Sequence, residues 1–200
     1  VVGCVADHYL PDFVSDFSKE FPDYWRKGIK VPFDAYFGSE IGKIARAFNF
    51  GLKDSITNVV KMQNFLIGVK SPSEVLEEST ANFSFRKKYL EILKKYEQLL
   101  KKAKENVSEK IVLFDYSGEI SISSELANEL CYLYPKKYVA VVYRNGAIAN
   151  VSLRGKNVKK ILEKVLREVD GTGGGHEDAV GARISMKDLD KFREILEREI

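Results

Sequence analysis

Two apolar runs that meet at a single dipeptide constrain the fold of this chain most strongly. Residues 138–143 and 147–153 consist mainly of Val, Ala, Tyr and other apolar types, and Asn145 and Gly146 lie between the runs. Both residues of the dipeptide tolerate a positive φ, which the turns of two-residue hairpins require. The pattern predicts an antiparallel β-hairpin in the second half of the chain.

The residues around the hairpin alternate between strand-like and helical periods, which indicates one compact domain. The predicted elements are, in order, a strand at 111–114, a helix opened by Ser123 and closed by Pro135, the hairpin, a helix over 156–169, a glycine-rich loop, a short helix, a strand at 183–185 and a helix over 186–200. This order predicts an α/β or α+β fold in which helices pack on a small mixed sheet.

The first half of the chain reads as mainly helical after its first residues. Val1 to Ala6 is a short apolar run that predicts a buried strand. Because no initiator Met and no earlier strand precede it, we expect the chain to be a fragment. Apolar positions at helical spacing over 39–66 predict one long helix, bent near Gly51, and a second long helix is expected over about 82–106.

The Lys side chains of this second helix admit two interpretations. They either solvate a surface helix, with Glu91 and Lys95 as an i,i+4 ion pair, or they contact phosphates. The candidates for a phosphate-binding groove are Lys94, Lys95, Lys101 and Lys102.

Composition excludes several classes of protein. With 44% hydrophobic and 30% charged residues, the chain has the apolar surface of a folded protein, whereas its net charge of +3 does not by itself indicate a nucleic-acid binder. Cys4 and Cys131 lie far apart without a CxxC pair, which argues against a zinc site and a disulfide framework. We find no apolar run of membrane-spanning length and no signal segment, so we expect a cytoplasmic protein with no membrane partner.

The segment Gly171–His176 is the most informative motif in the chain. Its consecutive glycines let backbone N–H groups approach an anion. We expect His176 to begin a helix, whose N-terminus would favour phosphate. The segment matches neither G-x-G-x-x-G nor G-x-x-x-x-G-K-[ST], which argues against a dinucleotide or P-loop site. The alternative is a flexible loop between two helices.

Arg154 is the second candidate for anion binding, because it ends the strand that follows the hairpin turn. A guanidinium group binds phosphate with two parallel hydrogen bonds. We expect its side chain to project from the sheet toward the glycine loop. The alternative is an ordinary surface Arg at a strand end.

Taken together, Ser152-Leu153-Arg154 and Gly173-Gly174-Gly175-His176 resemble the SLR and GGGH signatures of the DHHA1 domain of DHH phosphoesterases. That superfamily includes RecJ-type exonucleases, oligoribonucleases and cyclic-dinucleotide phosphodiesterases. The resemblance implies a DHHA1-like α/β domain that binds substrate phosphate or the terminal nucleotide. The residues implied to bind substrate are Ser152, Arg154, Gly173, Gly174, Gly175 and His176. It also implies a closely packed helix after His176, where Ala179–Ala182 keeps the frame of the family's Ala-Ala-Gly.

The start of the chain resembles the last motif of the DHH catalytic domain, because Gly3 to Asp7 fits G-x-x-A-D at a strand end. The resemblance implies that Asp7 is a catalytic residue and a ligand of Mn²⁺ or Mg²⁺. The family's earlier motifs, including Asp-His-His, are absent from these residues. We therefore expect most of the metal ligands to lie upstream and the 200 residues alone to be inactive.

The resemblance implies three parts: the end of a DHH catalytic domain at 1–36, a helical connector at 37–108 and a DHHA1 substrate-binding domain at 109–200. It further implies a metal-dependent phosphodiesterase, an archaeal RecJ-like exonuclease acting on single-stranded DNA or RNA, with replication or repair proteins as further partners. One alternative is a phosphodiesterase for short oligonucleotides or cyclic dinucleotides. Another is a non-catalytic scaffold of a replication assembly. A third, an accessory domain of alanyl-tRNA synthetase type, is disfavoured by the G-x-x-A-D strand.

Overall fold

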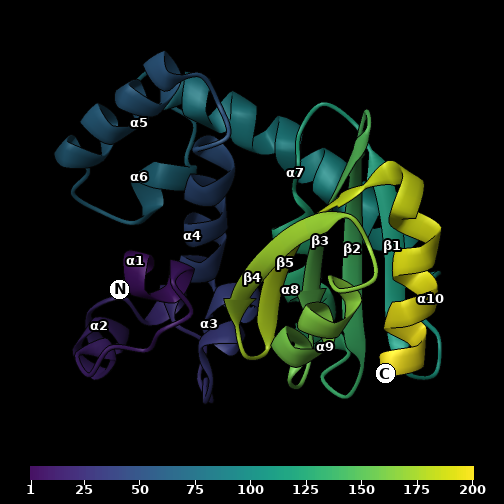
Figure 1. The fold of residues 1–200 in the computed structure, drawn as a ribbon. Helices are drawn as coiled ribbons and strands as arrows, with labels where there is room; N and C mark the ends of the chain where they lie inside the picture. The colour runs from purple at the N-terminus through teal and green to yellow at the C-terminus, as the bar shows by residue number, and fades with distance from the viewer. The chain divides into compact units, whose positions relative to one another are not determined.

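The computed structural model describes all of residues 1–200. The chain forms two compact units, Val1–Lys95 and Tyr96–Ile200 (Figure 1). The finer boundaries at residues 36 and 108 stay a prediction. None of the helices combines the length and the apolar character needed to cross a membrane.

The first unit consists of helices. They are α1 (Val2–Ala6), α2 (Val14–Glu20), a 3-10 turn η1 (Pro22–Tyr24), α3 (Pro32–Gly38), α4 (Glu40–Gly51), α5 (Ile56–Gly68), α6 (Ser73–Leu76) and the first part of α7 (Phe83–Ala103). The apolar face of α4 supplies much of the core, with Ile41, Ile44 and Phe50 almost completely buried. Helical spacing of these apolar residues is what the sequence predicted for this segment.

The strand predicted at Val1–Ala6 is wrong, because these residues form the helix α1. The Val5 N–H donates to the Val1 carbonyl at 2.9 Å, and the Asp7 N–H donates to that of Gly3 at 2.9 Å. A run of six apolar residues fits a short strand and a short helix equally well. The first unit contains no strand, so a strand here would leave backbone groups without partners. The G-x-x-A-D strand was the argument against an accessory domain of alanyl-tRNA synthetase type, and that argument no longer holds because the segment is helical.

The single long helix predicted over 39–66 is also wrong, because the chain leaves the helical path between α4 and α5. Each helix has its own N-cap: the Ser39 hydroxyl accepts from Gly42 N–H at 3.2 Å, and the Ser55 hydroxyl accepts from Asn58 N–H at 3.4 Å. Serine at this position satisfies a backbone donor that the first helical turn leaves unpaired. The cap at Ser55 is therefore the signal for a second helix.

On α7 the expected ion pair of the surface helix is present. The Glu91 carboxylate accepts from Lys95 at 3.2 Å and also lies 3.5 Å from the Lys88 ammonium. The hydrogen bond from Lys95 is the main reason why the pKa of Glu91 lies below its usual value. These contacts favour the interpretation of α7 as a solvated helix along this stretch.

The second unit is built on a five-stranded mixed sheet. Its strands are β1 (Ile111–Ser117), β2 (Tyr138–Asn145), β3 (Ile148–Arg154), β4 (Gly171–His176) and β5 (Ala179–Ser185), in the spatial order β1-β2-β3-β5-β4. β1 and β2 are parallel, and the other neighbours are antiparallel. The predicted hairpin is confirmed, with Asn145 paired to Ile148 and Gly146 at φ +61°.

The predicted packing of helices on a mixed sheet is confirmed, and the helices cover both of its faces. α9 (Val158–Val165) and α10 (Leu189–Glu199, after the turn η2, Met186–Asp188) lie on one face, and α8 (Ser123–Leu133) lies on the other (Figure 1). Ala149, Val151 and Leu153 of β3 belong to the apolar core beneath α9 and α10. Alternate residues of a strand point to opposite faces, so the residues between them point toward the α8 face.

The glycine-rich loop and the helix predicted after it are wrong. Residues 171–176 form the edge strand β4, and residues 179–185 form its antiparallel partner β5. The strand predicted at 183–185 is the end of β5. Val180 and Ile184 are buried while Gly181 and Arg183 are exposed, which is the period of a strand rather than of a helix.

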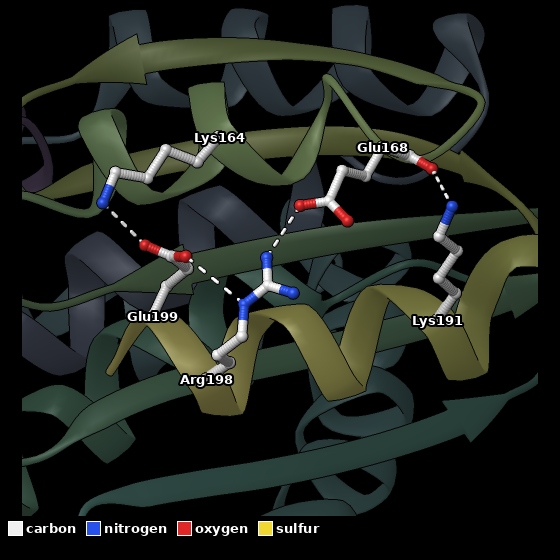
Figure 2. A network of polar contacts seen from close by, with 5 residues as sticks. All are labelled: Lys164, Glu168, Lys191, Arg198 and Glu199. Carbon is white, nitrogen blue, oxygen red and sulfur yellow. Dashed lines mark hydrogen bonds and ion pairs between the residues drawn. The ribbon is translucent and has the colours of Figure 1, made fainter.

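An ion network ties α9 and the segment after it to α10 (Figure 2). The Glu199 carboxylate accepts from Lys164 at 2.6 Å and lies 3.5 Å from Arg198 Nε. Arg198 Nη2 lies 2.7 Å from the Glu168 carboxylate, and Lys191 donates to the Glu168 carbonyl at 2.6 Å. The network lies at the surface, where solvent and salt weaken each pair.

We expect Glu199→Gln to lower Tm only slightly. The hydrogen bond from Lys164 lowers the pKa of Glu199, so its contribution is present above the ordinary carboxyl pKa and is lost as the pH falls through the folded value. Thermal unfolding at neutral pH, at low pH and in high salt checks this, and the difference from wild type should vanish in the last two conditions. Glu197→Gln, an exposed carboxyl without an ion pair, is the control. A large, salt-independent loss of Tm would contradict the surface interpretation.

Candidate functional site

An open pocket of about 650 Å³ lies in the second unit, where strands β3, β5 and β4 meet the start of α8. Its polar side chains include Ser123 and Ser124 from α8, Asn150 and Ser152 from β3, Thr172 from β4 and Arg183 from β5. Arg183 is the one charged residue in the lining, which contains neither Asp nor Glu. A pocket with one cation and several hydroxyl and amide groups favours an anion.

The register of the sheet explains why these side chains share a face. Directly paired residues of antiparallel strands point to the same side of a sheet. The three rows across β3, β5 and β4 are Asn150–Arg183–Thr172, Ser152–Gly181–Gly174 and Arg154–Ala179–His176. In the middle row only Ser152 has a side chain, because its partners are Gly181 and Gly174. The backbone of β5 and β4 is therefore uncovered on this face, between the other two rows.

Ser152 holds the start of α8 against the sheet. Its hydroxyl lies 3.1 Å from the Ser123 hydroxyl and 3.2 Å from that of Ser124. Ser152 and Ser123 are both buried, with 5% of their surface exposed. Buried hydroxyls need such partners, because an unpaired buried polar group is costly. Ser152 therefore positions the pocket wall as well as lining it.

The Arg154 guanidinium is held by α8 and by the strands β3 and β5. Its Nε donates to Asn128 Oδ1 of α8 at 2.7 Å, and its Nη1 donates to the carbonyls of Leu153 at 3.0 Å and Val180 at 3.2 Å. Burial lowers the pKa of Arg154. Only Nη2 makes no hydrogen bond, so most of the guanidinium is used within the protein.

The glycines of β4 differ in how much space surrounds the position that a Cβ would take. A Cβ on Gly173 would lie 2.7 Å from the Gly181 carbonyl oxygen, and one on Gly175 would lie 2.5 Å from that of Ala179. Gly175 also has φ +145°, which side chains rarely adopt. A Cβ on Gly174 meets nothing within 4 Å. Two of the three glycines are thus needed by the β4–β5 pairing itself.

His176 ends β4 with an exposed side chain that makes no hydrogen bond. Through Ala179 it shares a row with Arg154 at a separation of two strands, roughly 10 Å. The side chain is therefore available at the open edge of the same face.

The structure brings only part of the predicted site into the pocket. Ser152 lines it, whereas Arg154, Gly173, Gly174, Gly175 and His176 lie on the same strands but outside its lining. Sequence reasoning missed Arg183, Asn150, Thr172, Ser123 and Ser124. The alternation of buried and exposed residue types over 179–185 was the available signal, because it places Arg183 on the face opposite Ile184.

Asp7, the predicted catalytic and metal-binding residue, lies in the first unit as the exposed C-cap of α1. No group of three or more His, Cys, Asp or Glu side chains in the chain is arranged to hold a metal ion. Mg²⁺ and Mn²⁺ take about six oxygen ligands, so one carboxylate does not make a two-ion centre. The role of Asp7 stays a prediction.

Comparison with known proteins agrees with this fold. Residues 108–200 match the model of the DHHA1 domain, and no curated protein sequence matches the chain. The structure of RecJ from Thermus thermophilus in complex with Mg²⁺ is similar at a TM-score of 0.60 and 14% identity, over 98% of this chain and 29% of RecJ. PggH from Vibrio cholerae, a pGpG-specific phosphodiesterase, is similar at 0.52 and 18%, over 78% of this chain and 56% of PggH. The chain thus spans less than two thirds of either protein, and the likeness is one of fold.

Proposed function

We propose that this chain, whose residues 108–200 match the DHHA1 domain, belongs to a protein of the DHH/DHHA1 superfamily and is the substrate-binding part of a metal-dependent phosphodiesterase that hydrolyses single-stranded nucleic acid. The observation that carries the proposal is the pocket on β3, β5 and β4, which has one Arg and no carboxylate. Such a surface suits the phosphates of a nucleic-acid strand.

The proposal assigns binding, not bond cleavage, to this chain. RecJ structures contain Mg²⁺ or Mn²⁺, and we propose that the complete protein also uses one of these ions. When bound, such ions activate water and stabilise charge in phosphodiester hydrolysis. The residues present here do not form a metal centre, so the 200 residues alone should bind strands without cutting them.

Within the binding surface, we propose that a strand crosses the three rows described above. Gly174 and Gly181 leave room for its backbone, and His176 and Nη2 of Arg154 offer donors at one side. The fold likeness to a second RecJ structure, described as that of an exonuclease, covers 89% of this chain and is consistent with this substrate class.

We expect His176→Ala to weaken binding of a single-stranded oligonucleotide by about three- to tenfold, the effect of losing one ordinary hydrogen bond. Fluorescence anisotropy of a labelled oligothymidylate of about 12 nucleotides measures the affinity of the chain. Tm should not change, because the side chain is exposed and unbonded.

The control for this test is Lys160→Ala, which removes an exposed charge from α9 on the other face of the sheet. Equal affinity of His176→Ala and wild type would remove His176 from the binding surface. Absence of any salt-dependent binding by the wild-type chain would overturn the proposed function.

A small-nucleotide phosphodiesterase is the second candidate, favoured by the fold likeness to the pGpG-specific PggH. The two candidates differ in how affinity depends on length. A site for long strands gains affinity with each further phosphate contact, whereas a site for dinucleotides does not. Titration of the chain with a dinucleotide and with the longer oligothymidylate separates them.

The non-catalytic alternative differs at the level of the complete protein. A scaffold would bind nucleic acid without metal-dependent hydrolysis, and it would act through replication or repair proteins. Hydrolysis of a labelled strand by the complete protein, abolished by a chelator, supports the enzyme and contradicts the scaffold.

A further inference from the structure

Arg183 is the charged side chain of the pocket, and no contact within the protein uses it. It is exposed on β5 and takes part in no ion pair and no side-chain hydrogen bond. Other surface arginines of the second unit are paired, such as Arg198 with Glu168 at 2.7 Å and Arg144 with Asp115 at 3.0 Å, whereas Arg167 is exposed without a pair and lies outside the pocket. An arginine in a pocket without carboxylates keeps all five N–H donors for an anion.

The neighbours of Arg183 add donors on both sides. Asn150 on β3 and Thr172 on β4 are its direct partners across the sheet. Side chains in such positions start about 5 Å apart, which is close enough for one phosphate group to contact more than one of them. Neither Asn150 nor Thr172 makes a side-chain hydrogen bond within the protein. The side chains of Asn150, Arg183 and Thr172 are therefore all available to bind a ligand.

The glycines of the adjacent row leave space for a ligand. A Cβ on Gly181 would have Val151 O at 3.8 Å as its nearest contact, and one on Gly174 would meet nothing within 4 Å. Packing thus tolerates a side chain at either position, in contrast to Gly173 and Gly175. A ligand that approaches the sheet closely at these two positions accounts for both glycines.

Arg154 is in the opposite situation. Three hydrogen bonds from Nε and Nη1 tie it to α8, to its own strand β3 and to the neighbouring strand β5. It therefore ties the middle of α8 to the sheet, while only one nitrogen remains for a ligand.

We infer that Arg183, flanked by Asn150 and Thr172, binds a phosphate group of the substrate, and that Arg154, with only Nη2 left for the ligand, is chiefly a positioning residue. The identity of the ligand as a nucleic-acid strand rests on the proposed function. The assignment of binding to Arg183 and of positioning to Arg154 rests on the contacts described above.

The test uses the chain with labelled oligothymidylate at several salt concentrations. Arg183→Ala should weaken binding about tenfold and reduce the dependence of log Kd on log salt by about one ion, with Tm unchanged. Arg183→Lys keeps the charge and should lose less. Lys160→Ala is the matched control, because it removes one positive charge from the opposite face. Affinity of Arg183→Ala within about twofold of wild type would overturn the inference while leaving the proposed function intact.

A second probe separates failure of the inference from failure of the proposed function. If the wild-type chain binds no oligonucleotide, the proposed function fails, and inorganic pyrophosphate then tests Arg183 alone. A rise in Tm with pyrophosphate that Arg183→Ala abolishes supports the inference. No rise, or the same rise in both proteins, overturns it.

Discussion

Replacing Gly42 by Ala should destabilise the first unit by about 3 kcal/mol, the upper range for an overpacked core. A Cβ at this position would lie 2.2 Å from the Tyr36 carbonyl oxygen and 2.3 Å from that of Ala35. Both atoms belong to the backbone of α3, so neither can move without shifting the helix. Alanine is a better helix former than glycine by about 1 kcal/mol, and the clash outweighs that gain.

The cause is the short joint between α3 and α4. Ser39 alone connects Gly38 to Glu40, and its buried hydroxyl donates to the Ala35 carbonyl at 2.6 Å while accepting from Gly42 N–H. The first turn of α4 is thereby held against the last turn of α3, and only a glycine fits between them.

Urea unfolding followed by circular dichroism measures the effect. Gly3→Ala is the control, because it lies in helix α1 and a Cβ there meets nothing within 4 Å. It should be neutral or slightly stabilising. Equal stability of the Gly42→Ala and Gly3→Ala variants would show that the α3–α4 joint is not tightly packed.

The elements that the sequence predicted well are those whose side chains carry a clear period. The hairpin at Asn145-Gly146 and the apolar faces of α7, α8 and α9 are of this kind. The wrong secondary-structure predictions concern segments that are too short, or have too few side chains, to show a hydrophobic period. Val1–Ala6 is too short to separate a helix from a strand, and Gly171–Gly175 has almost no side chains to show one. β4 exists because β5 pairs with it, which is a tertiary effect that local patterns do not contain.

The candidate site shows the same division. The sequence placed Ser152 in the site, and the structure locates it in the pocket wall. The direction of Arg154 depends on Asn128, which lies 26 residues away on α8, so no local pattern could supply it. Arg183 was overlooked because the strand was predicted to begin at that residue, which hid the alternation that runs from Ala179 to Ser185.

Arg154→Ala should cost about 2–3 kcal/mol of stability, because it leaves the Asn128 side chain and the Val180 carbonyl without their donor. The loss of favourable contacts is partly offset, since burying a guanidinium is itself unfavourable and already lowers the pKa of Arg154. Urea unfolding of the chain gives the free energy, and Arg183→Ala serves as the matched arginine control with no expected loss.

Binding measurements on the same two variants then separate positioning from contact. A positioning role predicts that Arg154→Ala loses stability first and that Arg154→Lys, which restores a charge and one donor near Asn128, recovers part of both stability and affinity. A contact role predicts the reverse order, with affinity lost about tenfold and the free energy of unfolding within about 0.5 kcal/mol of wild type. That second outcome would make Arg154 a phosphate-binding residue, because a side chain whose three hydrogen bonds contribute nothing to stability would have no structural function.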